Sequence, residues 1–178
     1  MADNWAAEVL DFWFALKPQQ WWRGSSELDD EVRERFHQLW EEQSGRSVSG
    51  FLGSPRDALA AVILFDQFPR NMNRGHADSF ATDHMALGIA TAAVGRGYDD
   101  QLSPLERGIL YMPFQHSEDL EDQQRSVALF TALGGDQLGF AKKHHDVIER
   151  FGRFPHRNRV LGRRPRPDEL AAGDVVPW

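Results

Sequence analysis

Residues 54–65 read SPRDALAAVILF, and this stretch decides the fold class. Ser54, Pro55 and Asp57 each suit one position of a helix N-terminus: a hydroxyl cap, a proline in the first turn and an acid two residues later. The eight residues that follow Asp57 are apolar on every side. They predict a helix at the centre of the core, and they are too few to span a bilayer, which takes about 20 residues.

The same pattern of a helix start recurs at residues 103–106, which read SPLE. Apolar residues spaced three and four apart indicate further amphipathic helices, and the alternation typical of strands is absent. The pattern predicts an all-α fold with about seven main helices, arranged as an irregular array of antiparallel helix pairs. The expected helices cover residues 4–16, 26–40, 54–68, 77–96, 103–113, 117–134 and 136–151.

Prolines and capping residues set the expected helix ends. We expect Pro18, Pro69 and Pro113 to end the helices that precede them, because proline removes a backbone donor. We expect Ser117 to cap the sixth helix, with Glu118 in its first turn, where an acid is stabilised by the helix dipole without any further role.

Length and composition place the chain among ordinary globular proteins. Its 178 residues predict a single helical domain over 1–163 and a C-terminal tail over 164–178 with a short helical turn. The chain has no cysteine, and its N-terminus lacks the basic start of a signal peptide, so we expect a soluble cytoplasmic protein without membrane contact.

Charge is unevenly distributed along the chain. The net charge is −7, yet seven arginines fall between residues 150 and 166. Such a segment either holds an anionic ligand or docks against acidic residues of the same chain, and the sequence leaves both open. The acidic balance and the lack of a recognised motif disfavour nucleic acid as a partner.

Four blocks resemble one bacterial family. They are LFDQFPRNMNRG (64–75), SFATD (79–83), SPLERGILYMPFQHSEDLEDQQRSVALF (103–130) and IERFGRFPHRNRVLGR (148–163). The sequence is similar to the family catalogued as domain of unknown function 924. The resemblance implies a fold like that of tetratricopeptide-repeat arrays, and it implies no activity. The tail, RRPRPDE (163–169), departs from the family's usual helix start.

Asp66 is the most unusual single residue, because it follows a very apolar run. An unpaired buried carboxylate costs several kcal/mol, roughly, so Asp66 needs compensation. One interpretation is an ion pair with Arg70 or Arg74. The other is a carboxylate kept for a ligand or a proton transfer.

His116 is the second candidate for proton transfer, since a loop histidine titrates near neutral pH. It is equally well interpreted as a hydrogen-bonded loop residue. His144 falls on an apolar stripe, where a core histidine is usual. The dipeptide His145-Asp146 lacks the distant partners of a phosphohydrolase metal site, so we expect no metal and no cofactor.

Two segments share a sequence pattern that is consistent with a ligand site. Residues 68–71 read FPRN and residues 154–158 read FPHRN, so both place guanidinium and amide groups after Phe-Pro. Guanidinium groups bind carboxylate and phosphate in bidentate fashion. The alternative is that these arginines only cap helix carbonyls.

These observations favour a binding module with an arginine-rich polar groove for a small anionic ligand or a peptide. The alternative is a hydrolase-like or lyase-like enzyme that uses Asp66 or His116, so enzymatic activity stays open. The sequence does not fix the oligomeric state; Trp21 and Trp22 either form an exposed patch or close the core. The candidate binding residues are Arg70, Asn71, Arg74, Arg125, Arg150, Arg153, His156, Arg157 and Asn158.

Overall fold

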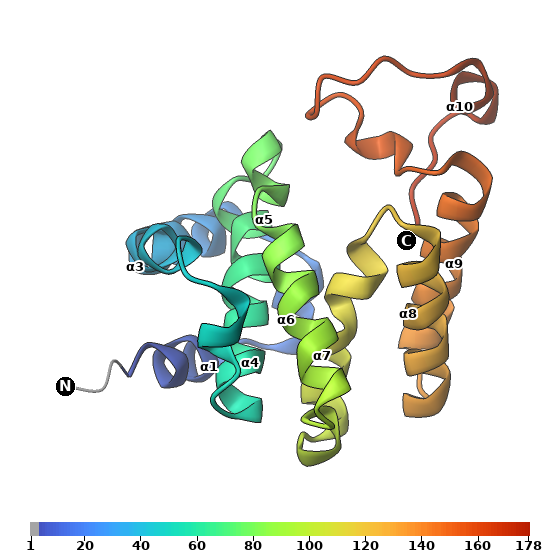
Figure 1. The fold of residues 1–178 in the computed structure, drawn as a ribbon. Helices are drawn as coiled ribbons and strands as arrows, with labels where there is room; N and C mark the ends of the chain where they lie inside the picture. Colours follow the sequence, from blue (N-terminus) through green and yellow to red (C-terminus); the bar gives the residue numbers. More distant parts are fainter. Residues whose placement is uncertain (1–3) are drawn as a thin grey trace. The chain divides into compact units, whose positions relative to one another are not determined.

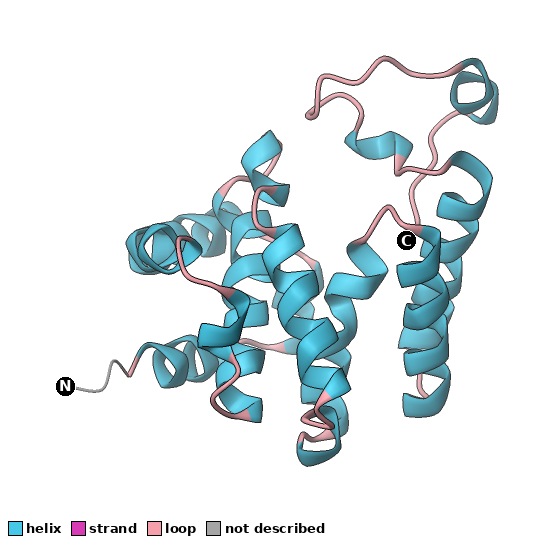
Figure 2. Ribbon diagram, in the orientation of Figure 1, coloured by secondary structure: helices cyan, strands magenta, loops and turns pink. Residues whose placement is uncertain are grey.

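The computed structural model describes residues 4–178, which fold into helices joined by loops (Figure 1). No strand occurs among these residues, as the colouring in Figure 2 makes plain, and the all-α prediction is confirmed. No helix in the described part of the chain is long and apolar enough to cross a membrane. The residues group into two compact units, of which the first ends at Leu110 and the second is Tyr111–Trp178.

The helices follow one another closely in both units. The first unit contains α1 (Trp5–Ala15), α2 (Pro18–Trp22), α3 (Ser26–Ser44), η1 (Val48–Phe51), α4 (Pro55–Val62), η2 (Ile63–Gln67), α5 (Phe68–Met72), η3 (Ala77–Phe80), α6 (Asp83–Gly95) and η4 (Asp99–Gln101). Helix α7 (Pro104–His116) begins in the first unit and ends in the second. The second unit continues with α8 (Leu120–Leu133), α9 (Gln137–Phe151), η5 (Pro155–Arg157) and α10 (Pro167–Ala172).

The centre of the first unit is α4, as its sequence predicts. Every residue from Ala58 to Val62 is fully buried, and α4 packs against both α1 and α6. Aromatic rings fill the space beside it, with the ring of Phe36 centred 5.0 Å from Phe12 and 4.5 Å from Phe68. Tight ring packing of this kind stabilises a core beyond the area that it buries.

The two predicted helix starts are confirmed by their hydrogen bonds. The Ser54 hydroxyl accepts the Asp57 N–H at 3.1 Å. At the start of α7, Ser103 accepts the Glu106 N–H at 3.3 Å, and Glu106 accepts the Ser103 N–H at 2.9 Å. This reciprocal pair is a capping box, which satisfies two backbone donors at once.

Pro69 does not end its helix, so that prediction is wrong. The chain passes from α4 through one π-helical turn, η2, into α5, and the Phe68 N–H donates to the Ile63 carbonyl five residues back. Pro69 has no N–H to give to the Phe65 carbonyl. The Thr82 hydroxyl donates to that carbonyl instead, at 2.7 Å, so the helical path survives the proline.

Two further predicted ends also need correction. Pro113 lies inside α7, which continues to His116. Ser117 is not the cap of α8: Asp119 takes that position and accepts the N–H groups of Glu121 and Asp122. Glu118 therefore precedes the helix and is free to reach other parts of the second unit.

The second unit is built around the hairpin of α8 and α9, which lie side by side in Figure 1. Gly152 ends α9 with a φ of 68°, a left-handed conformation that glycine adopts without strain. The apolar cluster at the end of α9 includes Phe151 and Phe154. Ala172 and Val175 of the C-terminal segment pack against it, so this segment contacts the end of the hairpin.

Candidate functional site

The first group of candidate residues surrounds the π-helical turn. Asp66 lies in this turn with a fully buried side chain, and Gln67 donates to its carboxylate at 2.6 Å. Isolated π turns inside α-helices are frequent at functional sites because they redirect side chains. Here the turn brings a carboxylate into the core and presents it to polar groups of the following helix.

Arg70 forms an ion pair with this carboxylate. Its Nη1 donates to the Asp66 carbonyl at 2.6 Å and lies 3.3 Å from the Asp66 carboxylate. Two further bonds, of 2.7 and 2.9 Å, hold both carboxylate oxygens of Asp83. Burial alone would lower the pKa of Arg70, but Asp66 and Asp83 outweigh it and raise that pKa. The ion-pair interpretation of Asp66 is confirmed, with Arg70 as the partner.

Arg74 and Asn71 serve a different carboxylate. Arg74 donates to both oxygens of Asp29 at 2.6 and 2.9 Å, and Asn71 adds a bond of 2.8 Å. Burial raises the pKa of Asp29, but the hydrogen bonds from Arg74 and Asn71 outweigh burial and lower it. These bonds tie the end of α5 to the first turn of α3, which accounts for both residues without a ligand.

In the second unit, Glu118 holds the loop after α9. Its carboxylate accepts two bonds from Arg163, at 2.7 and 3.0 Å, and the Phe154 N–H at 2.7 Å. Burial raises the pKa of Glu118, and these donors more than reverse that effect. Sequence reasoning missed Glu118 and Arg163, because it placed Glu118 inside a helix whose dipole alone would explain an acid.

Two histidines flank Phe154, and a third lies beside one of them. The ring of His144 is centred 6.3 Å from His116 and 5.6 Å from Phe154, and the ring of His156 is 5.6 Å from Phe154. Burial lowers the pKa of His144 to about 3, with a further contribution from His116. Burial and the nearby Arg157 lower the pKa of His156 to about 4. Both imidazoles are therefore neutral at physiological pH.

His144 behaves as a core residue, and His156 carries an unpaired nitrogen. Nδ1 of His144 lies 2.8 Å from the Phe140 carbonyl, which satisfies it. Nδ1 of His156 is buried and makes no hydrogen bond with the described residues. Arg157 lies with its guanidinium 4.5 Å from the Phe154 ring and donates to the His116 carbonyl at 3.1 Å.

Glu169 fastens the C-terminal segment. Arg153 donates to both of its oxygens at 2.6 and 2.8 Å, Asn158 donates at 3.0 Å, and the Arg166 N–H donates at 2.7 Å. The bonds from Arg153 lower the pKa of Glu169 to about 2. A signal for Glu169 exists in the sequence, because Arg166-Pro167-Asp168-Glu169 repeats the order cap, proline, any residue, acid seen at residues 103–106.

The remaining predicted arginines stack on aromatic rings. The guanidinium of Arg125 lies 4.9 Å from the Phe114 ring, and that of Arg150 lies 4.7 Å from the Phe151 ring. Cation–π contacts at such distances contribute about 0.5–1 kcal/mol at exposed sites. Neither arginine is thereby withdrawn from solvent.

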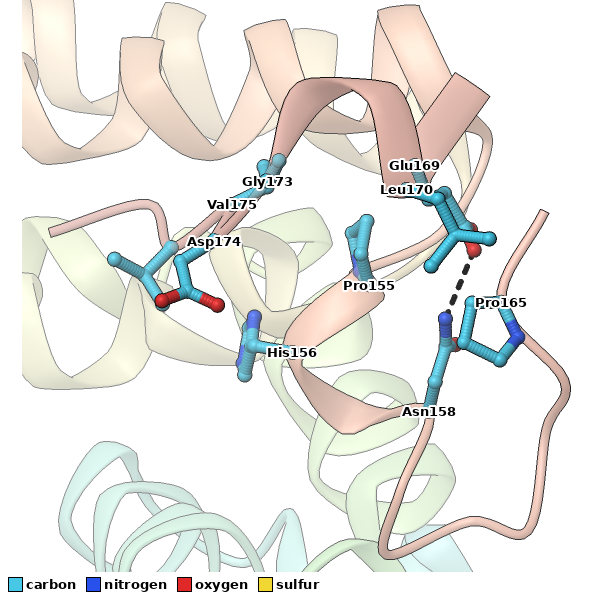
Figure 3. A pocket seen from close by; sticks show the side chains of 10 residues that line it. Pro155, His156, Asn158, Pro165, Glu169, Leu170, Gly173, Asp174 and Val175 are labelled. Carbon is cyan, nitrogen blue, oxygen red and sulfur yellow. Dashed lines mark hydrogen bonds between the residues drawn. The ribbon is translucent and has the colours of Figure 1, made fainter. Parts of the chain in front are cut away.

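A cleft of about 480 Å³ opens in the second unit between η5 and the C-terminal segment (Figure 3). His156 and Asp174 appear at one end of the cleft, and the bonded pair of Asn158 and Glu169 at the other. We call it the C-terminal cleft. Its lining residues are Pro155, His156, Asn158, Pro165, Glu169, Leu170, Gly173, Asp174, Val175 and Val176.

The structure brings some predicted residues together and leaves others to separate units. His156 and Asn158 share the C-terminal cleft, and the Arg157 guanidinium donates to the His116 carbonyl. Asp66 belongs to the first unit and His116 to the second.

Potential metal ligands gather at one place on α9. His145, Asp146 and Glu149 place ligand atoms within 4.8 Å of one another. Both acids are exposed, and acidic groups on an exposed helix face are common without an ion. We therefore assign no ion to this group.

Comparison with known proteins places the chain in a family. None of the curated proteins matches its sequence. A solved structure of a protein of unknown function from Agrobacterium tumefaciens is similar to it, with 40% sequence identity and a TM-score of 0.89 over 94% of this chain and 95% of that one. The model of the family described as "Bacterial protein of unknown function (DUF924)" matches residues 9–172. The chain therefore belongs to this bacterial family.

Proposed function

We propose that this chain is a binding domain and that its ligand occupies the C-terminal cleft. The observation that carries the proposal is the composition of the cleft wall, in which five apolar residues surround a few polar groups. Small-molecule sites commonly have this character and volumes of roughly 300–1,000 Å³. At about 480 Å³ the cleft suits a small molecule or the end of a peptide.

Three of the arginines that we expected to line a groove already bind carboxylates, and this favours the cleft as the ligand site. Arg70, Arg74 and Arg153 each hold a carboxylate of their own unit in two or more hydrogen bonds. A guanidinium engaged in this way has few donors left for a ligand. We therefore place the ligand beside His156 and Asn158, the two predicted binding residues that line the cleft.

Location and repeat character belong to the same proposal. We place the protein in the cytoplasm, which the absence of cysteine supports. We propose a tetratricopeptide-like arrangement of the helix pairs, which the helical hairpin of α8 and α9 supports. Arrays of this kind serve mainly as binding surfaces.

An enzyme is the second candidate, and one observation favours it. Asp66 lies in a π turn, with its carboxylate bonded to Gln67 and close to Arg70. A carboxylate held in this way suits a proton transfer if a substrate reaches it. Turnover of any compound that binds, lost in Asp66→Asn, would support this alternative.

The test is a thermal-shift screen of the full chain against short peptides, amines, and carboxylated and phosphorylated metabolites. A ligand at 100 times its dissociation constant stabilises the fold by about 2.7 kcal/mol. The screen is repeated on Leu170→Trp, which fills the cleft, and on Leu105→Trp, at another exposed leucine, on α7. We expect hits that only Leu170→Trp abolishes. A screen without hits, or hits that both variants retain, would overturn the proposal.

A further inference from the structure

We propose that the C-terminal cleft selects a cationic ligand, an ammonium group on a small apolar body. This inference rests on the proposed function and names its ligand class. It departs from the anion that the arginine-rich sequence around the cleft suggests.

Among the described residues, the cleft wall contains acids and no permanently charged base. Its ionisable residues are Glu169, Asp174 and His156, and none of the ten lining residues is lysine or arginine. His156 is neutral at physiological pH, because burial and Arg157 keep its pKa near 4. The formal charges of these lining side chains are therefore negative.

The two acids differ in what they have left for a ligand. Glu169 is neutralised by Arg153 and receives further bonds from Asn158 and the Arg166 N–H, so its oxygens are fully engaged. The Asp174 side chain is exposed and makes no hydrogen bond or ion pair with the described residues. Asp174 is thus the carboxylate that remains available in the cleft.

The surroundings of Asp174 suit the rest of such a ligand. Pro155, Leu170 and Val175 offer apolar contact for a short hydrocarbon chain. The ring of Trp178 is centred 4.9 Å from the ring of His156 and is 65% exposed. An exposed indole attracts cations through its π face, so it favours the same ligand charge as Asp174.

The experiment compares three probes of equal length: n-pentylamine, n-pentanol and pentanoate. Binding to the full chain at pH 7 is followed by amide NMR shifts of residues 155–176 and by the Trp178 indole signal. We expect the amine to bind up to about fivefold more tightly than the alcohol, as for an exposed ion pair, and pentanoate to bind weakest. Added salt should narrow these differences.

Matched variants assign the selectivity to one carboxylate. Asp174→Asn should weaken amine binding toward the level of the alcohol and leave alcohol binding unchanged. Asp168→Asn is the control, because Asp168 is an exposed acid of α10 outside the cleft wall. Equal losses in the two variants would trace the preference to general surface charge and overturn the role of Asp174.

The outcomes separate this inference from the proposed function. If pentanol or pentanoate binds as tightly as the amine and Leu170→Trp blocks it, the cleft is a binding site and its cation selectivity is refuted. If none of the three probes shifts the cleft signals, both the inference and the small-ligand cleft fail.

Discussion

Thr82 donates its hydroxyl hydrogen bond to the carbonyl oxygen of Phe65, at 2.7 Å, and so replaces the backbone donor that Pro69 lacks. The same hydroxyl accepts the Trp40 indole N–H at 3.1 Å. One buried side chain therefore joins α3, the π turn and the start of α6. This bond explains how a helix carries a proline beside its π turn.

Replacing Thr82 by valine should destabilise the protein by about 1–3 kcal/mol, because a buried carbonyl and an indole N–H both lose their partner. Urea unfolding measures the change. Thr131→Val is the control, since the Thr131 hydroxyl bonds only the Val127 carbonyl on an exposed helix face. Similar losses in the two variants would show that the Thr82 bond has no special weight.

Arg163 should matter far more than an exposed arginine in an ion pair. It donates to Glu118, to the Phe154 carbonyl and to Asn158, and is mostly buried. We expect Arg163→Gln to cost about 1–3 kcal/mol in the free energy of unfolding. Arg56→Gln, at a single bond to Glu106 and 60% exposure, should cost about 0–1 kcal/mol. A larger loss of unfolding free energy in Arg56→Gln than in Arg163→Gln would contradict this account of the loop after α9.

Two glycines should respond in opposite directions to alanine. Gly173 has a φ of 73°, so Gly173→Ala should cost about 1 kcal/mol through backbone strain, although nothing lies within 4 Å of the added Cβ. Gly139 lies exposed within α9, also with free space, and Gly139→Ala should add about 0.5–1 kcal/mol of stability. Denaturation of both variants tests the pair. A stabilising Gly173→Ala would mean that the C-terminal segment adopts another conformation.

Acidification should unfold the protein partly through its buried histidines. The pKa values of His144 and His156 are about 3 and about 4 in the folded chain, below the ordinary 6.5. The unfolded chain therefore binds these protons first, and the stability that they contribute is complete above pH 6.5 and declines as the pH falls toward 4.

Histidine NMR titration checks this directly. The ring signals of His144 and His156 should shift only below about pH 5 in the folded protein, and near pH 6.5 in the urea-unfolded chain. Titration of either ring near pH 6.5 in the folded protein would show that it is not buried as described.

Local chemistry predicts much of this fold. Ser54, Ser103 and Gly152 act on backbone groups a few residues away, so their sequence context is sufficient to place a helix end. Pro69 misled the prediction because its outcome depends on a distant partner: Thr82 donates to the Phe65 carbonyl, 17 residues away along the chain. Pro113 misled it as well, since α7 continues through this proline to His116.

The candidate site residues show the same contrast between local pairs, which the sequence predicts, and distant pairs, which it does not. Asp66 and Arg70 are four residues apart on one helical path, and their pairing was expected. Arg153 and Glu169 are 16 residues apart, and Glu118 and Arg163 are 45 apart, so no periodicity relates them. The C-terminal cleft lies between η5 and the tail, and composition alone does not predict where the tail packs.

The π turn at Ile63–Gln67 also has a consequence for aligning the family. Each residue of an α-helix turns the chain by about 100°, and a π turn absorbs roughly one residue more than a regular turn. Because the turn absorbs that extra residue, deleting one residue there would restore a regular helix and leave the later side chains, Arg70 included, in their present directions. A one-residue gap at this point in a relative would therefore mark a member that lacks the π turn but keeps the helix that follows it.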